Sequence, residues 1–154
     1  MARVDRTASA EEKEAFYLDN FKSKVPHAKD NHHYLYAIVR KDLQMPPGKL
    51  AAQAGHAYTD ALVQAQNQDP DRFNTYRRDG EGGSKITMQG KNVNALIKAY
   101  EQALDEGLPC ALIVDQEHVL PPHFDGSPVI TAVGIGPCTQ AEARAITKRF
   151  QCVG

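Results

Sequence analysis

An α/β fold with a mixed β-sheet covered by helices on both faces is predicted for this chain. Short apolar segments rich in β-branched residues read as strands, and they cover residues 34–40, 84–89, 110–114 and 129–135. Helical patterns separate the first three segments, which favours parallel neighbours joined by right-handed crossovers. The link before the last segment contains no helical pattern, so this strand can run antiparallel to the others.

The N-terminal residues 1–31 are mostly polar and are predicted to form a helical extension ahead of a domain of residues 32–154. Ser9 and Glu12 have the spacing of a capping box, which predicts a helix start, and Pro26 is expected to end this helix. The extension could pack on the domain, mediate association between copies or stay partly mobile. A homodimer is therefore kept as a candidate assembly.

A long helix is predicted after the break at Pro46 and Pro47, because residues 48–66 contain no proline and many alanines. Small side chains would let this helix pack closely on a sheet. Gly55 lowers its helix propensity by about 1 kcal/mol relative to alanine. Residues 69–83 read as a loop with room for one short helical turn.

The remaining helices are predicted from an amphipathic repeat and from the end of the chain. Apolar residues recur at helical spacing from Val93 to Leu104, and Gly107 fits the position just beyond the C-terminus of such a helix. A last helix is expected over residues 139–150.

Composition excludes several classes of protein. The 154 residues are 42% hydrophobic, which suits one compact domain, and the three cysteines have neither metal-ligand spacing nor a disulfide pattern. The N-terminus has no apolar signal region, and no apolar run is long enough to span a membrane. We therefore expect a cytoplasmic protein in a reducing compartment.

The net charge of −1 indicates that any contact with nucleic acid uses a local basic patch. Residues 71–91 contain five Lys or Arg and three acids, with Arg77 and Arg78 adjacent. This segment is a candidate RNA contact, and an ordinary solvated loop is the alternative interpretation.

Polar residues on the long predicted helix form one narrow stripe. At 100° per residue, Lys49, Gln53, His56 and Asp60 share a face. Lys49 lies in the first turn, where the helix dipole disfavours a cation and unpaired N–H groups favour an anion. We interpret Lys49 and the helix N-terminus as a site for a phosphate or an oxyanion, against the alternative of an exposed lysine.

Asp115 stands at the C-terminal end of a predicted central strand, where open α/β sheets usually place their sites. A turn-forming aspartate is the alternative. His56 could orient water, pair with Asp60 or Asp115, or be a structural histidine.

The segment MPPGKLAAQAGHA at residues 45–57 resembles the signature of the type 2 peptidyl-tRNA hydrolases. Further similar segments occur in the family's order over residues 33–150, and they are AIVRKDL, SKITMQG, DEGLP, LIVD and TAVGIGP. The resemblance implies a three-layer α/β/α sandwich around a four-stranded mixed sheet with one antiparallel strand. It also implies hydrolysis of the ester that joins a peptide to tRNA, without a metal or organic cofactor.

The resemblance also implies roles for individual residues. The expected catalytic residues are Lys49, Asp115, Thr131 and His56. The expected substrate-binding residues are Gly48, Gln53, Arg40, Lys41, Arg77, Arg78 and His118. Lys49 would contact the oxyanion or a phosphate, Asp115 would orient or activate water, and Thr131 and His56 would hold the network.

The loop after Asp115 departs from the family pattern. It reads QEHVLPPHFDGSP, is about four residues longer, and has Val119 where relatives place a second threonine. Either His118, His123 or Ser127 would then have to supply the missing hydrogen bond, or the activity is altered. Two other functions stay open, namely a noncatalytic tRNA-binding or partner-binding module and a hydrolase of another acylated adduct.

Overall fold

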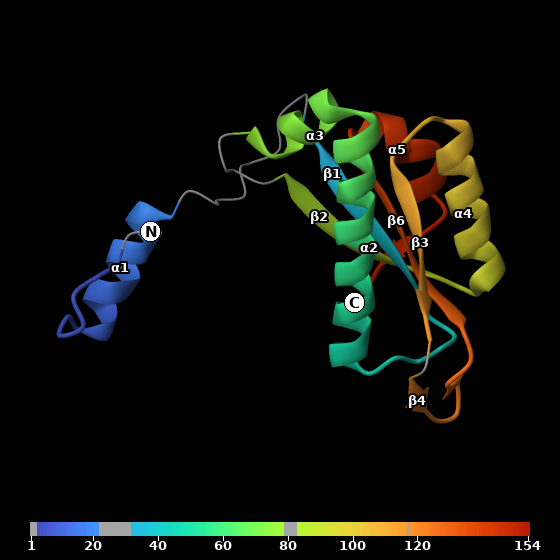
Figure 1. Ribbon diagram of the computed structural model, residues 1–154, viewed down its shortest axis with the longest axis horizontal. Coiled ribbons are helices and arrows are strands. Elements are labelled where there is room, and N and C mark those ends of the chain that lie inside the picture. Colours follow the sequence, from blue (N-terminus) through green and yellow to red (C-terminus); the bar gives the residue numbers. More distant parts are fainter. Residues whose placement is uncertain (1–2, 22–31, 79–82, 117) are drawn as a thin grey trace.

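The computed structural model describes residues 3–21, 32–78, 83–116 and 118–154, and Figure 1 shows a twisted sheet flanked by helices. The helices are α1 (Ala10–Asn20), α2 (Pro47–Gln68), α3 (Pro70–Tyr76), α4 (Val93–Asp105) and α5 (Gln140–Thr147). The strands are β1 (Tyr34–Arg40), β2 (Ser84–Gly90), β3 (Cys110–Asp115), β4 (Val119–Leu120), β5 (Phe124–Asp125), β6 (Val129–Cys138) and β7 (Gln151–Cys152). These elements confirm the predicted α/β class.

The main sheet is mixed and has the strand order β3-β6-β1-β2-β7. β1 and β2 are parallel neighbours, as their helical connection predicted. β6 runs antiparallel to both β1 and β3, which confirms the direction of the fourth predicted strand. The expectation that all of the first three strands are neighbours was wrong, because β6 lies between β1 and β3.

The expected count of four strands was also wrong, since the sheet has five. The additional strand is β7, whose Cys152 and Gln151 pair with Met88 and Gln89 of β2. Its two residues are too few to produce a periodic pattern in the sequence. A separate two-stranded hairpin, β4-β5, occupies the segment that was expected to be an irregular loop.

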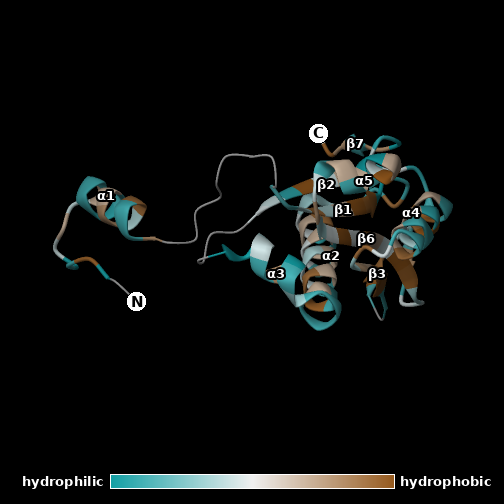
Figure 2. Ribbon diagram, turned by 90° about the horizontal axis from the view of Figure 1, so that it is seen from above, coloured by the Kyte–Doolittle hydropathy of each residue, from teal (hydrophilic) through white to brown (hydrophobic). Residues whose placement is uncertain are grey.

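Helices cover both faces of the sheet, and Figure 2 shows α2 and α3 on one side with α4 and α5 on the other. Alternation along β1 explains how one strand serves both layers. Ala37 and Val39 pack with alanines of α2, whereas Tyr36 and Ile38 pack with residues of α4 and α5. β1 is central, and its five inner residues are all buried.

The predicted N-terminal helix is confirmed as α1. Ser9 is its N-cap, and Ser9 and Glu12 form both hydrogen bonds of a capping box. The helix has no buried residue and ends at Asn20, whereas Pro26 lies outside the described residues. None of the helices in the described ranges is long and apolar enough to cross a membrane.

α4 begins and ends as the apolar repeat predicted, and Gly107 follows it with a φ of 71°. Its buried face is displaced from the predicted stripe. Leu96, Ala99 and Ala103 are buried, whereas Leu104 is 51% exposed. The small side chains of Ala99 and Ala103 permit close contact of this face with the sheet.

Arg72 of α3 joins the two helical layers at one end of the sheet. Its guanidinium donates two hydrogen bonds to Glu142 of α5, at 2.8 and 2.9 Å, and others to Asp69 and the Pro137 carbonyl. The hydrogen bonds from Arg72 to Glu142 are the main cause that lowers the pKa of Glu142 to about 2. Arg72 is consequently a structural cation, although it belongs to the basic segment identified in the sequence.

The backbone of α2 lies directly against the sheet at Gly134 of β6. A Cβ atom at this position would lie 2.0 Å from the carbonyl oxygen of Ala57 and 3.1 Å from the Cβ of Ala61. Ala54, Ala57, Ala61 and Ala65 form the buried face of α2. The predicted close packing of this helix on the sheet is confirmed, and the side chains that allow it are hydrogen atoms and methyl groups.

Replacing Gly134 by alanine should therefore destabilise the fold. Because the backbone of α2 must move away from β6, we expect the free energy of unfolding to fall by about 1–3 kcal/mol. Gly55→Ala is the matched control, since a Cβ on this exposed residue of α2 meets nothing within 4 Å. It should raise the free energy of unfolding by about 1 kcal/mol. Urea denaturation followed by circular dichroism measures both, and equal stability of Gly134→Ala and wild type would contradict the packing.

Candidate active site

Lys49 and Asp115 are brought together from distant parts of the chain. The Lys49 Nζ atom donates a hydrogen bond to Oδ2 of Asp115 at 2.8 Å, and the two side chains are only 11% and 19% exposed. Lys49 comes from the first turn of α2, and Asp115 ends β3. Asp115 lies at the end of a strand as predicted, but β3 is an edge strand and not the central strand expected.

Phe124 of the β4-β5 hairpin covers the same ammonium group. Its buried ring centroid lies 4.4 Å from Lys49 Nζ. The cation thus contacts a carboxylate on one side and the electron-rich face of an aromatic ring on another. This contact limits access of water to the ion pair, which strengthens its electrostatic interaction with any group that binds there.

The N-terminus of α2 leaves backbone donors beside Lys49. Pro46 is the N-cap residue and provides no side-chain hydrogen bond, and the first turn contains no acidic residue. Gly48 is exposed, with open space where a Cβ would be. Uncapped N–H groups and the adjacent ammonium together make a site that favours an anion or a developing oxyanion.

A β-bulge in β6 determines where Thr131 points. Ile113 of β3 pairs with Ala132, and Val114 pairs with Ile130, so Thr131 has no opposite residue in β3. Ile130 packs against the core cluster on the α4 side, whereas Ala132 packs in the cluster on the α2 side. The extra residue therefore turns Thr131 toward α2, which regular alternation would not do.

Thr131 is fully buried and binds the neighbouring helix. Its Oγ1 donates a hydrogen bond of 2.5 Å to Oε1 of Gln53, which is also buried. Gln53 lies one helical turn after Lys49 on α2. The hydrogen bond fixes the rotation of α2 about its axis, and it thereby fixes the direction in which Lys49 extends.

The predicted polar stripe of α2 is divided in the structure. Gln53 is buried, whereas His56 and Asp60 are exposed. Among the hydrogen bonds and ion pairs of the described residues, none joins His56 to Asp60 or Asp115. The sheet therefore covers only one edge of the stripe, and the structure does not bring His56 into the Lys49–Asp115 contact.

The hairpin after Asp115 contributes an aromatic contact but not the missing hydroxyl. The ring of exposed His118 meets the ring of Phe124 edge-on, with 5.8 Å between centroids. Val119 is 67% exposed, and the Ser127 hydroxyl donates to Asp125. Of the proposed substitutes for the second threonine, His118 is the one that contacts the ring covering Lys49.

The predicted cationic residues are distributed around this site. Arg40 donates two hydrogen bonds to Asp42 and one to the Ile130 carbonyl, and the guanidinium holds the pKa of Asp42 below its ordinary value. Lys41 is exposed beside it. Arg77 and Arg78 follow α3 and line a separate hollow of about 570 Å³, away from Lys49.

Phe124 is the residue of this site that sequence reasoning missed. The available signal was a lone aromatic residue among turn-forming and polar residues in PPHFDG. Such a residue is buried only if the loop folds back on the domain, as the β4-β5 hairpin does here. In the part of the chain that the structure describes, no group of three or more His, Cys, Asp or Glu could hold a metal ion.

Comparison with known proteins identifies the family. The family model described as peptidyl-tRNA hydrolase PTH2 matches residues 33–153. A peptidyl-tRNA hydrolase of Methanocaldococcus jannaschii is 36% identical over 104 residues, which are 67% of this chain and 84% of the relative. A peptidyl-tRNA hydrolase of Staphylothermus marinus is 36% identical over 111 residues, which are 71% and 86% of the two chains. The chain therefore belongs to the PTH2 family of peptidyl-tRNA hydrolases.

Proposed function

We propose that this protein hydrolyses the ester bond between a peptide and the terminal ribose of tRNA, and that Lys49 and Asp115 lie at the reaction centre. The observation that carries this proposal is their contact of 2.8 Å beside the uncapped N-terminus of α2. Membership of the PTH2 family supplies the substrate class.

In the proposed reaction, Asp115 orients a water molecule and accepts one of its protons as the water oxygen attacks the ester carbonyl carbon. Lys49 and the first N–H groups of α2 stabilise the negative charge that develops on the carbonyl oxygen. The bond from the carbonyl carbon to the ribose oxygen then breaks, and the proton passes to that oxygen. The products are a peptide with a free carboxyl group and tRNA with a free ribose hydroxyl.

Thr131 and Gln53 act in this proposal as positioning residues. Their buried hydrogen bond holds the first turns of α2 at a fixed rotation over the end of the sheet. Phe124 shields the ammonium from water, and His118 supports Phe124 by contact between the rings. His56 is exposed on the outer side of α2, and its proposed role is to contact the bound substrate.

The tRNA is proposed to contact Gly48 at the helix N-terminus, the basic pair Arg40 and Lys41, and the exposed arginines after α3. Among the residues that the structure describes, Arg77 and Arg78 share their hollow with one acid, Asp71. Phosphate groups bind such local cation clusters even when the net charge of the protein is close to zero.

Removing the ion pair should abolish turnover. We expect Lys49→Ala to eliminate cleavage that is measurable at steady state, because it removes the cation that stabilises the oxyanion. Asp115→Asn should reduce kcat by about a hundredfold or more, because the amide cannot accept a proton from water. The assay follows release of free tRNA from an N-acylated aminoacyl-tRNA. Lys148→Ala, which changes an exposed lysine at the end of α5, is the control for loss of one positive charge.

Wild-type protein that binds tRNA without cleaving it would contradict the hydrolase assignment and favour a noncatalytic RNA-binding module. Faster cleavage of a different acylated adduct would instead change the substrate. Comparison of acylated tRNA with a free N-acylated amino-acid ester separates these outcomes.

Weakening the contact between β6 and α2 should slow the reaction without removing it. Thr131→Val replaces the hydroxyl by a methyl group and leaves the buried Oε1 of Gln53 without its donor. We expect kcat to fall about tenfold with KM little changed, and Thr131→Ser to recover most of the loss. If Thr131→Val lowered thermal stability but left kcat unchanged, the hydroxyl would be structural only.

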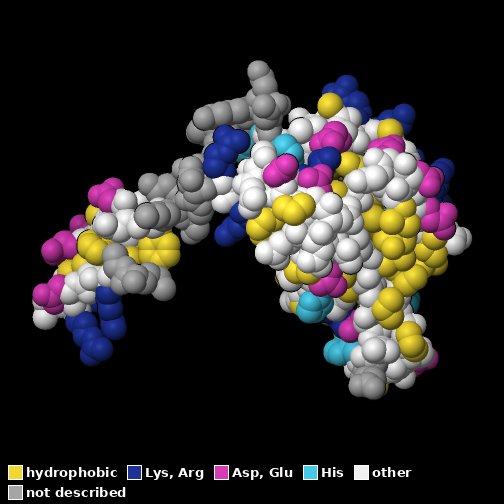
Figure 3. All heavy atoms as spheres, turned by 45° about the horizontal axis from the view of Figure 1, so that its top comes forward, with side chains coloured by type: hydrophobic (Ala, Val, Ile, Leu, Met, Phe, Trp, Pro, Cys, Tyr) yellow, Lys and Arg dark blue, Asp and Glu magenta, His cyan; other side chains and the backbone are white. Residues whose placement is uncertain are grey.

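We also propose that the protein is a cytoplasmic homodimer that associates through the open edge of β3. The three cysteines are free, as a reducing compartment requires. Among the strands that the structure describes, β3 pairs with β6 alone, and residues of α2, β3 and α4 line one hollow along its outer side. Leu104 of α4 and Val114 of β3 are each 51% exposed, and Figure 3 shows hydrophobic side chains gathered in a band on one side of the molecule.

A charge on this surface should separate the proposed subunits. Leu104→Lys places an ammonium group where a second copy would bury apolar surface, so the variant should sediment as a monomer. Analytical ultracentrifugation of the full chain measures the mass, with Leu104→Met as the volume-matched control. A monomeric wild type at micromolar concentration would contradict the proposal.

A further inference from the structure

We propose that a basic hollow at the end of β2, distinct from the Lys49–Asp115 site, binds consecutive phosphates of an RNA backbone, with a ribose or base against Phe150. The hollow has a volume of about 710 Å³. The inference rests on the proposed function in one respect, namely that the RNA is the tRNA part of the substrate.

Four cationic side chains from different elements line this hollow, and they are Lys41, Lys91, Lys98 and Arg149. Lys41 follows β1, Lys91 lies in the turn between β2 and α4, Lys98 belongs to α4, and Arg149 follows α5. All four residues are exposed. Convergence from four separate segments produces a concave basic surface, which a solvated face of one helix would not do.

The acidic residue of the hollow does not neutralise the lysines that line it. Of the described residues, Asp42 is the one acid in the lining, and both of its carboxylate oxygens accept hydrogen bonds from Arg40. Among the ion pairs found in the described ranges, none includes any of the three lysines. The lysines are therefore available to an external anion.

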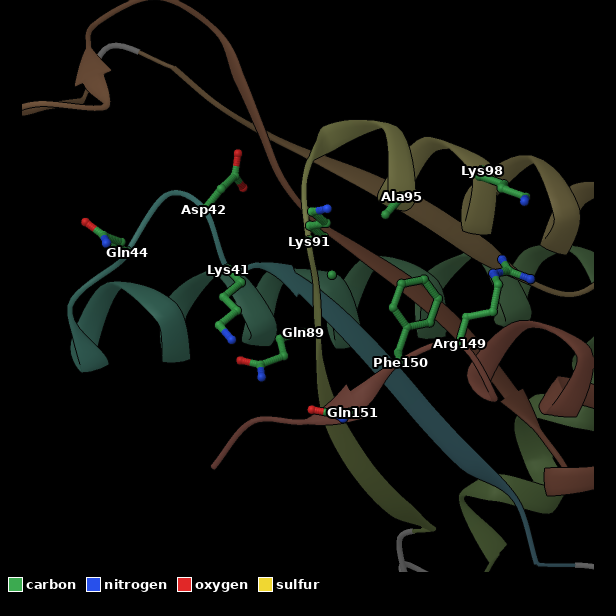
Figure 4. A pocket seen from close by; sticks show the side chains of 11 residues that line it. Lys41, Asp42, Gln44, Gln89, Lys91, Ala95, Lys98, Arg149, Phe150 and Gln151 are labelled. Carbon is green, nitrogen blue, oxygen red and sulfur yellow. The ribbon is translucent and has the colours of Figure 1, made fainter.

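The cations are spread along the hollow. Figure 4 shows Lys41 near one end, Lys91 in the middle, and Lys98 close to Arg149 at the other end. A row of cations fits the regular spacing of phosphates in a nucleic acid, whereas a single small anion would need donors that converge on one point. Gln89 and Gln151 add uncharged hydrogen-bonding groups to the lining.

Phe150 and Arg149 provide a surface for stacking. The Arg149 guanidinium lies 5.6 Å from the centroid of the Phe150 ring. It is held there by hydrogen bonds from Nη1 to Gln102 Oε1 at 2.8 Å and to the Ala145 carbonyl at 3.0 Å. In Figure 4 the Phe150 ring lies among the labelled cations, so a nucleotide whose phosphates contact the lysines can place a ring or ribose against it.

The hollow and the candidate active site lie at the same end of the sheet. The Lys41 N–H donates to the Gly90 carbonyl at 2.9 Å, which joins the ends of β1 and β2. Five residues further along the chain, Pro46 caps α2 and leads directly to Lys49. One RNA strand can therefore contact the basic hollow while its acylated end reaches Lys49 and Asp115.

The test compares two variants with the same change in charge. Lys91→Gln/Lys98→Gln removes two positive charges from the hollow, and Arg144→Gln/Lys148→Gln removes two from the exposed side of α5, outside the hollow. Binding of deacylated tRNA is measured by fluorescence anisotropy between about 50 and 200 mM salt. Steady-state cleavage of N-acylated aminoacyl-tRNA provides kcat and KM, and thermal melting checks that both variants fold.

We expect the hollow variant to bind tRNA about tenfold or more weakly, with the slope of log K against log salt reduced by about 2, since two phosphate contacts are lost. Its KM should rise by a similar factor with kcat unchanged, and the control variant should match wild type. Equal affinity and equal salt slope in the two variants would overturn the inference. If the hollow variant lost binding of inorganic phosphate but kept its affinity for tRNA, the inference would also be overturned, in favour of a small-anion site.

The outcomes separate this inference from the proposed function. If wild type cleaves the substrate and both double variants have the same KM, the hollow does not bind the tRNA and the hydrolase proposal stands. If tRNA binding depends on the hollow but wild type cleaves no acylated tRNA, the hollow is an RNA site and the hydrolase proposal fails.

Discussion

The close approach of α2 to β6 is the constraint on which the rest of the structure depends. Gly134 has no room for a side chain against the Ala57 carbonyl, and the alanine face of α2 continues this contact along the helix. A helix packed so closely on a sheet cannot rotate or slide without collision, because the interior is as dense as a crystal. The position of the first turn of α2 over the sheet end follows from this packing.

The position of this first turn brings together the residues of the candidate site, which are far apart in the sequence. The first turn carries Lys49 to Asp115, the next turn carries Gln53 to Thr131, and the β4-β5 hairpin folds Phe124 over the ammonium. The ion pair, the uncapped N–H groups of α2 and the ring of Phe124 all lie at one end of the sheet. A hydrolase that uses water directly needs such a charged, partly shielded site and no side-chain nucleophile.

Local sequence pattern was sufficient for the four longer strands β1, β2, β3 and β6, the capping of α1 and the limits of α4. It also made Lys49 and Asp115 candidates for the site, since one breaks a helix-dipole preference and the other ends a strand. The insertion of β6 between β1 and β3 depends on long-range pairing, which no local pattern records. Likewise, the bulge that turns Thr131 inward and the burial of Phe124 arise from pairing register and hairpin folding. The same limitation explains why the role of Arg72 was not predicted. Arg72 belongs to the basic segment of residues 71–91, but in the structure it forms ion pairs with Asp69 and with Glu142 of the other helical layer.

The central claim is that Lys49 and Asp115 act as one unit, and a double-mutant cycle on kcat/KM tests it most directly. Residues that act together lose their function together, so the double variant Lys49→Ala/Asp115→Asn should be no more than about threefold slower than the slower single variant. Because the single variants are expected to be very slow, single-turnover measurement at high enzyme concentration is needed to resolve them. Reductions that multiply in the double variant would show that the two side chains contribute independently, and the ion pair would then not be the reaction centre.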